Sequence, residues 1–181
     1  MSFQATSVDL RYMAMEDRLQ VTLRGDTETV DLMITRRLTR AILSAFVDLL
    51  MRSSTEIGRV PASARGDVLL FEHMEAAHGW AQETSPATAS STADAQAPQS
   101  VPKAAPTLTT KVDIGVRQGS LSLVFFDQGG ERSHIILPRD KAHRLLSMLV
   151  EKCHAAQWDI GEMSWLGRRG QVVIPDRASL S

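Results

Sequence analysis

Leu10-Arg-Tyr-Met-Ala14 and Leu19-Gln-Val-Thr-Leu23 return 102 positions later as Val112-Asp-Ile-Gly-Val116 and Leu121-Ser-Leu-Val-Phe125. Every second residue in all four stretches is apolar, which is the period of a β-strand with one buried face. A short polar break separates the two stretches in each copy. The pattern therefore predicts two β-hairpins of the same design.

Each predicted hairpin is followed by a second turn and a third apolar strand. In the first copy Gly25-Asp26 comes before a strand over 30–34, and in the second copy the turn over 127–130 comes before a strand over 135–137. This third strand is offset by 103 positions rather than 102, so we expect one inserted residue in the turn of the second copy. An insertion inside the strand would turn its buried face outward.

A helix follows each third strand, because apolar residues then recur at steps of three and four. Thr35 can accept a hydrogen bond from the first turn of the first helix, and Pro138 suits the first position of the second. The apolar stripes are Leu38, Ile42, Ala45, Phe46 and Leu49 in the first helix, and Ala142, Leu145, Leu146, Leu149 and Cys153 in the second. The predicted fold class is α+β: two β-β-β-α repeats related by pseudo-two-fold symmetry, with antiparallel sheets and helices packed on one face. The pattern leaves open whether the halves form one continuous sheet.

The composition is that of a soluble globular chain. Its 181 residues are 43% hydrophobic, enough for one domain or two small interlocked halves. The formal charge of −1 provides no strong field toward nucleic acid or an anionic membrane. A single cysteine excludes an internal disulfide and favours a reducing compartment. With no secretory signal pattern and no run of 18 apolar residues, we expect a cytoplasmic protein without a membrane segment.

The remaining sequence divides around these two repeats. A helical pattern over 67–83 is followed by a stretch rich in Ala, Ser, Thr, Pro and Gln, which is too polar to offset its ordering entropy. The expected organisation is a first β-β-β-α unit over 1–55, a connecting helix region over 56–83, a flexible low-complexity linker over 84–107, and a second unit over 108–181 that ends in a hairpin.

Residues with catalytic or metal-binding potential do not form recognisable patterns. There is no Gly-x-Ser-x-Gly elbow, and Cys153 falls on a buried helical stripe, where thiols are usually inert. His154 lies on another face of that helix. His73 and His78 are five residues apart, whereas two ligands on one helix need a spacing of three or four. We therefore expect no catalytic residue, no metal site and no cofactor.

Phosphate-binding loops are also missing from the sequence. Neither a Walker A motif nor Gly-x-Gly-x-x-Gly occurs, and Gly129-Gly130 suits a hairpin turn. Gly167-Arg-Arg-Gly170 has the spacing of the loop with which KH domains clamp RNA. That loop joins two helices, however, and the β-branched residues after Gly170 favour a strand. An ordinary turn is the preferred interpretation.

Both predicted repeat helices begin with basic residues, although the N-terminus of a helix carries positive partial charge. Basic residues at both helix starts depart from the usual preference for acidic ones. This suggests the hypothesis of paired sites that bind an acidic partner or a phosphate. The alternative is that these side chains extend into water or pair with Glu28, Asp31 and Asp140. The residues in question are Arg36, Arg37, Arg40, Arg139, Lys141 and Arg144.

The segment Leu32-Met-Ile-Thr-Arg-Arg-Leu38, with the hairpin over 17–24 before it, resembles uncharacterised bacterial proteins that carry a Leu-x-Leu-Thr-Arg-Arg segment after a strand. The stretches 71–77 and 156–158 are similar to them as well, so the likeness covers most of the chain outside the linker. The resemblance implies a bacterial, compact, non-membrane protein, and it implies no activity.

Three functions remain open on these grounds. The leading expectation is a non-enzymatic interaction or accessory protein that presents sheet edges and helix faces to another protein or to a second copy of itself. A nucleic-acid-binding module that uses the basic helix starts is the first alternative, although an aromatic content of 5% argues against it. The second alternative is an enzyme with a site between the two repeats.

Overall fold

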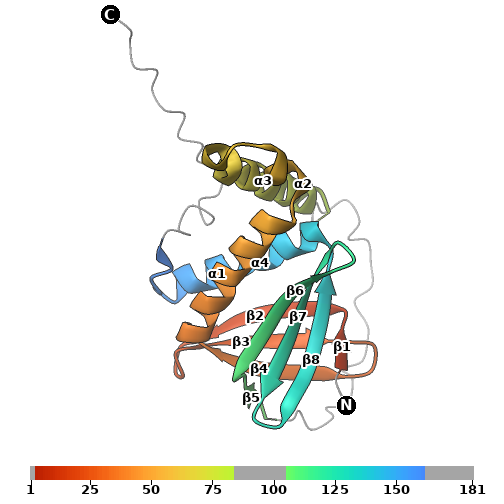
Figure 1. Cartoon of the computed structure of the whole chain (residues 1–181). Helices are drawn as coiled ribbons and strands as arrows, with labels where there is room; N and C mark the ends of the chain where they lie inside the picture. The colour runs from red at the N-terminus through yellow and green to blue at the C-terminus, as the bar shows by residue number, and fades with distance from the viewer. Residues whose placement is uncertain (1–2, 84–104, 162–181) are drawn as a thin grey trace, which may run out of the picture.

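The computed structural model describes residues 3–83 and 105–161 and has an α+β fold (Figure 1). The same order of four strands and a long helix occurs twice, which is consistent with the predicted pair of repeats. The first half contains β1 (Phe3–Ala5), β2 (Ser7–Met13), β3 (Arg18–Arg24), β4 (Thr29–Thr35), α1 (Arg36–Ser53), α2 (Thr55–Arg59), the short 3-10 helix η1 (Ala62–Ala64) and α3 (Arg65–Glu83). The second half contains β5 (Thr107–Leu108), β6 (Lys111–Arg117), β7 (Ser120–Asp127), β8 (Gly130–Leu137) and α4 (Arg139–Ala155).

The three strands predicted for each copy pair with one another in antiparallel order. Their expected faces are buried at the central positions, whereas Val116 in β6 is exposed and Ala14 lies exposed in the turn after β2. Val21 lies opposite Leu10 on one side and Leu32 on the other, and all three are buried. In the second copy Leu123 lies between Ile114 and Ile135 in the same way. The alternating pattern therefore identified both the strands and their pairing order.

The residue inserted in the second copy lies inside β8 rather than in the turn, which corrects the expected position. Phe125 pairs with Ser133 and Phe126 pairs with Glu131, so Arg132 has no partner and forms a β-bulge. A bulge takes up one extra residue without reversing the faces beyond it. Ser133 and Ile135 consequently still point into the core.

Two short strands that the sequence pattern did not reveal connect the halves. β1 pairs in parallel with β8, where Gln4 lies opposite His134. β5 pairs in parallel with β4, where Leu108 lies opposite Met33. The chain therefore forms two separate four-stranded sheets, in the orders β1-β8-β7-β6 and β2-β3-β4-β5. Each half contributes the edge strand that completes the sheet of the other half.

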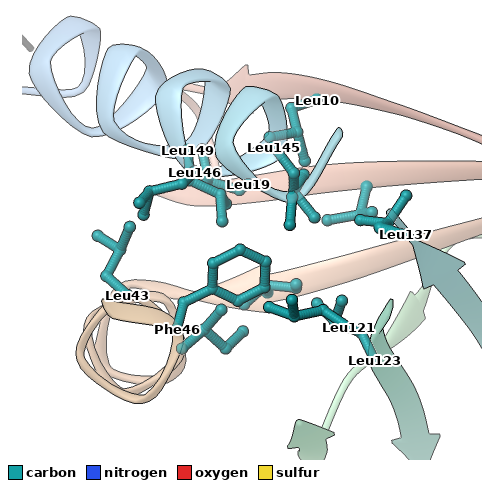
Figure 2. Close-up of a cluster of buried hydrophobic side chains, with 14 of the residues drawn as sticks. Leu10, Leu19, Leu43, Phe46, Leu121, Leu123, Leu137, Leu145, Leu146 and Leu149 are labelled. Atoms are coloured by element: carbon teal, nitrogen blue, oxygen red, sulfur yellow. The ribbon is translucent and has the colours of Figure 1, made fainter. Parts of the chain in front are cut away.

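The two long helices also contact both halves. Besides its own strands β3 and β4, α1 contacts β6, and α4 contacts β2 as well as β7 and β8. Figure 2 shows the ring of Phe46 from α1 pointing between the leucines of α4 and Leu121 and Leu123 of β7. Phe46 and Leu123 are almost completely buried. The sheets and helices thus enclose one shared hydrophobic core.

The predicted starts of the two repeat helices agree with the structure to within one residue. The hydroxyl of Thr35 accepts a hydrogen bond from the Leu38 amide at 3.3 Å, which confirms Thr35 as the N-cap of α1. Pro138 lies one position earlier than expected, immediately before α4, and its carbonyl accepts from the Ala142 amide at 2.9 Å. Proline is tolerated there because a helix start has no intrahelical partner for the missing amide.

The connecting region also contains the predicted helix, which begins at Arg65 rather than at residue 67. α2 and α3 lie at the end of the molecule away from the sheets (Figure 1). Most of the expected linker, and the hairpin expected near Gly167, lie outside the described residues, while Thr107 at the linker's end begins β5. No helix in the described ranges is both long and apolar enough to cross a membrane.

Replacing Gly25 with alanine tests the path of β1. A Cβ atom at this position would lie 2.7 Å from the Gln4 backbone carbonyl and would also collide with the ring of Phe3. Because a backbone atom cannot move aside easily, we expect Gly25→Ala to lower the free energy of unfolding by about 1–3 kcal/mol. Gly115→Ala is the control, since a Cβ there meets nothing within 4 Å. If both variants have the same urea midpoint, the backbone of β1 does not pass next to Gly25.

Candidate functional site

The basic residues at the start of α1 lie around an open hollow on the protein surface. Arg36, Arg37 and Arg40 line this hollow, which has a volume of about 400 Å³, and all three side chains are exposed. We refer to it as the arginine hollow. Within the described residues none of the three makes an ion pair, so the pairing expected with Glu28 or Asp31 is not observed for them.

The neighbourhood of the arginine hollow includes a contact between the two halves. Trp158, just after α4, donates from its indole nitrogen to the Asp17 carboxylate at 2.7 Å, and the Tyr12 hydroxyl donates to the same oxygen at 2.9 Å. These two hydrogen bonds lower the pKa of Asp17, and the charge of Arg36 lowers it further. The Asp17 carboxylate is thus already held by two donors.

The lone cysteine lies under the same region. Cys153 is fully buried, as its position on the helical stripe predicted. Burial raises the pKa of its thiol to about 11, and the Arg36 guanidinium only partly opposes this effect. The thiol is therefore protonated at neutral pH and is a poor nucleophile.

The basic residues at the start of α4 have a different setting. Lys141 and Arg144 are exposed. Arg139 is instead turned toward the C-terminal end of α1, where it donates to the Leu50 carbonyl and the Ser53 hydroxyl, each at 2.9 Å. The charge of Arg36, at the start of α1, lowers the pKa of Cys153 near the C-terminal end of α4. The basic starts of α1 and α4 therefore lie at opposite ends of this helix pair. The structure does not bring them together.

Arg139 belongs to a second feature, a partly buried polar cluster where α3 meets α4. Its guanidinium donates to Glu72 Oε2 of α3 at 2.6 Å. The other carboxylate oxygen, Oε1, accepts from the Ser54 hydroxyl at 2.6 Å, and that hydroxyl in turn caps α2 through the Ile57 amide. One carboxylate thereby ties together α2, α3 and α4.

Two histidines complete this α3–α4 cluster. His73 of α3 and His143 of α4 are 6% and 2% exposed, and their Nδ1 atoms are 3.4 Å apart. Nε2 of His143 lies 3.8 Å from Glu72 Oε2. Burial, followed by the charges of His73 and Arg139, lowers the pKa of His143 to about 4, and burial lowers that of His73. Both imidazoles are therefore neutral at pH 7.

The α3–α4 cluster is not predictable from the sequence pattern, because its two histidines come from different helices and lie 70 residues apart. Spacing on one helix relates His73 to His78, whereas in the structure His73 contacts His143. The one available signal was His143, next to the apolar stripe of the second repeat helix. No rule based on local spacing pairs this histidine with a residue of α3. Across residues 3–83 and 105–161, no group of three or more potential ligands is arranged to hold a metal ion.

Comparison with known proteins adds no further information on the site: no family model, no curated protein and no solved structure matches the chain. The resemblance over residues 17–24, 32–38, 71–77 and 156–158 therefore rests on its short motifs alone.

The ion pair between Glu72 and Arg139 provides a test of the α3–α4 cluster. Removing the carboxylate with Glu72→Leu leaves a half-buried guanidinium without its partner, so we expect a loss of about 2–4 kcal/mol in the free energy of unfolding. The double variant Glu72→Leu/Arg139→Met removes both charges and is expected to recover at least half of that loss.

The matched control for this test is Glu56→Gln, which breaks an exposed ion pair with Arg59. Its expected effect on the free energy of unfolding is below about 0.5 kcal/mol. Urea denaturation measures all three variants. A double variant that is less stable than Glu72→Leu would contradict the proposed role of the pair.

Proposed function

We propose that this protein is a non-enzymatic interaction protein that binds an acidic segment of a partner protein in the arginine hollow. The observation that carries the proposal is the set of three exposed arginines, without ion pairs in the described residues, around a hollow of about 400 Å³. Guanidinium groups bind carboxylates through two parallel hydrogen bonds. The positive end of α1 adds to the attraction for an anion.

The charge distribution favours a short acidic peptide over a long polyanion. The chain as a whole has a net charge of −1, so its long-range field does not attract a nucleic acid. Aromatic residues make up 5% of the sequence, which provides little surface on which bases stack. The positive charge is thus local, and a local site suits a few carboxylates.

An enzyme with a site between the halves receives less support. The region between them is filled by the shared core around Phe46. In the α3–α4 cluster the Glu72 carboxylate is already bound by Arg139 and Ser54, and His73 contacts His143. A cytoplasmic location is part of the proposal and is supported by the single, fully buried cysteine, which suits a reducing compartment.

Replacing Arg36, Arg37 and Arg40 together with alanine tests the proposal. The probe is a fluorescein-labelled peptide rich in Asp and Glu, and its binding is followed by fluorescence anisotropy at about 0.15 M ionic strength. We expect the triple variant to bind the peptide at least about tenfold more weakly, a loss of about 1.4 kcal/mol. The side chains are exposed, so the urea midpoint should change little.

The control variant replaces Arg52, Arg59 and Lys111 with alanine, which removes the same total charge from residues that each have an exposed carboxylate partner. Equal weakening in both variants would reduce the effect to net charge and refute the proposed site. A single-stranded oligonucleotide that binds more tightly than the peptide would instead favour the nucleic-acid alternative.

A further inference from the structure

Few of the described side chains of α3 are both apolar and buried. Among residues 65–77, whose side chains are described, Leu69 and His73 are the buried ones. By contrast, α1 buries Ile42, Leu43, Phe46 and Leu50 among its residues. A helical segment that buries few apolar side chains can separate locally at a lower free energy than one that is packed in the core.

The geometry of the α3–α4 cluster favours one placement of its hydrogens. Nε2 of His143 lies 3.8 Å from the Glu72 carboxylate, too far for a hydrogen bond, but the negative charge there favours a hydrogen on that nitrogen. In a neutral imidazole the other nitrogen, Nδ1, is then an acceptor. The Nδ1 atom of His73, 3.4 Å away, must therefore be the donor. This arrangement requires that no hydrogen be present on Nδ1 of His143.

We propose that His73 and His143 form a proton-operated latch that holds α3 on α4 at neutral pH and releases it under mildly acidic conditions. A proton added to Nδ1 of His143 places hydrogens on both facing nitrogens and breaks the bond between the rings. Protonation of both rings also creates two positive charges whose ring centroids are 5.5 Å apart inside the contact. Separation of α3 relieves both effects.

Among the described residues, the charged groups around His143 act in both directions. On α4 the positive charge of Arg139 opposes protonation of His143 and the negative charge of Asp140 favours it. On α3 Glu72 also favours protonation, but its carboxylate is already hydrogen-bonded by Arg139 and Ser54. From α1 the cluster is reached by the Leu50 carbonyl and the Ser53 hydroxyl, which are uncharged.

The direction of the pH effect follows from the burial of the two rings. Both have a pKa below the ordinary value of 6.5 while α3 is docked, and that of His143 is about 4. The released helix therefore binds protons more readily than the docked one. Docking is fully favourable above pH 6.5 and weakens as the pH falls from 6.5 toward 4. The pKa of Asp17 is lowered below its ordinary value of 3.8, so its contact with Trp158 survives through this range.

Hydrogen exchange of the full chain, read by mass spectrometry at about pH 7.5 and about pH 5 and corrected for intrinsic rates, tests the latch. We expect the protection of residues 65–77 to fall at least about tenfold at the lower pH, relative to the strands. β3 and β7 should keep their protection. Nitrogen NMR of the wild-type imidazoles should show a hydrogen on Nε2 of His143 at pH 7, and charging of the pair should coincide with the loss of protection.

The variant His73→Leu/His143→Met removes both titrating groups with little change in volume, and we expect it to lose the pH effect. Should it fail to fold, His73→Gln keeps a neutral donor beside His143 and should reduce the effect. The control His134→Gln/His154→Gln removes two other histidines and should leave the effect unchanged. The latch is refuted if α3 keeps its protection at low pH, if the non-titrating variant loses it equally, or if β3 and β7 open together with α3.

Discussion

The structure depends on the burial of one hydrophobic core that neither half can form alone. Three strands and one helix leave a sheet edge unpaired and an apolar face uncovered, and both deficits are met by the other half. β1 and β5 cross over to complete the opposite sheets, and α1 and α4 reach the strands β6 and β2 of the opposite half. Phe46 shows the consequence, since its ring is buried against leucines of the second half (Figure 2). Unfolding of either half would expose the core of the other.

Most of the architecture could be predicted from the sequence because it is encoded by local periods. Alternation around Leu10 and Val21 identified strands, and the repeat of this pattern after 102 residues identified the second copy. Thr35 marked the start of a helix through its own side chain. The exchanged strands were not predictable, because Phe3–Ala5 and Thr107–Leu108 are too short to show a period, and their pairing is decided by partners more than 70 residues away in sequence. The bulge at Arg132 appeared in the sequence only as a change of offset, which does not say where the extra residue lies.

The two candidate sites also differed in how far the sequence could predict them. The arginines of α1 were identified because three cations next to a helix start are visible in the sequence and remain exposed in the structure. Arg139 looked equivalent at that level, yet its guanidinium is engaged by Glu72 and by the end of α1. The pairing of His73 with His143 arises only after α3 docks on α4, and no spacing rule relates two such helices. Long-range packing therefore decides which basic residues are available and which histidines are buried together.

Separation of the chain into two polypeptides, residues 1–83 and residues 84–181, tests the mutual dependence of the halves most directly. Each would be purified alone and then mixed, with the dispersion of backbone amide NMR signals as the readout. Shared burial around Phe46 and the exchange of β1 and β5 predict that each fragment alone gives the narrow spectrum of an unfolded chain. Mixing should restore a dispersed spectrum and a cooperative unfolding transition. A dispersed spectrum from either fragment alone, in a monomeric sample, would contradict the account.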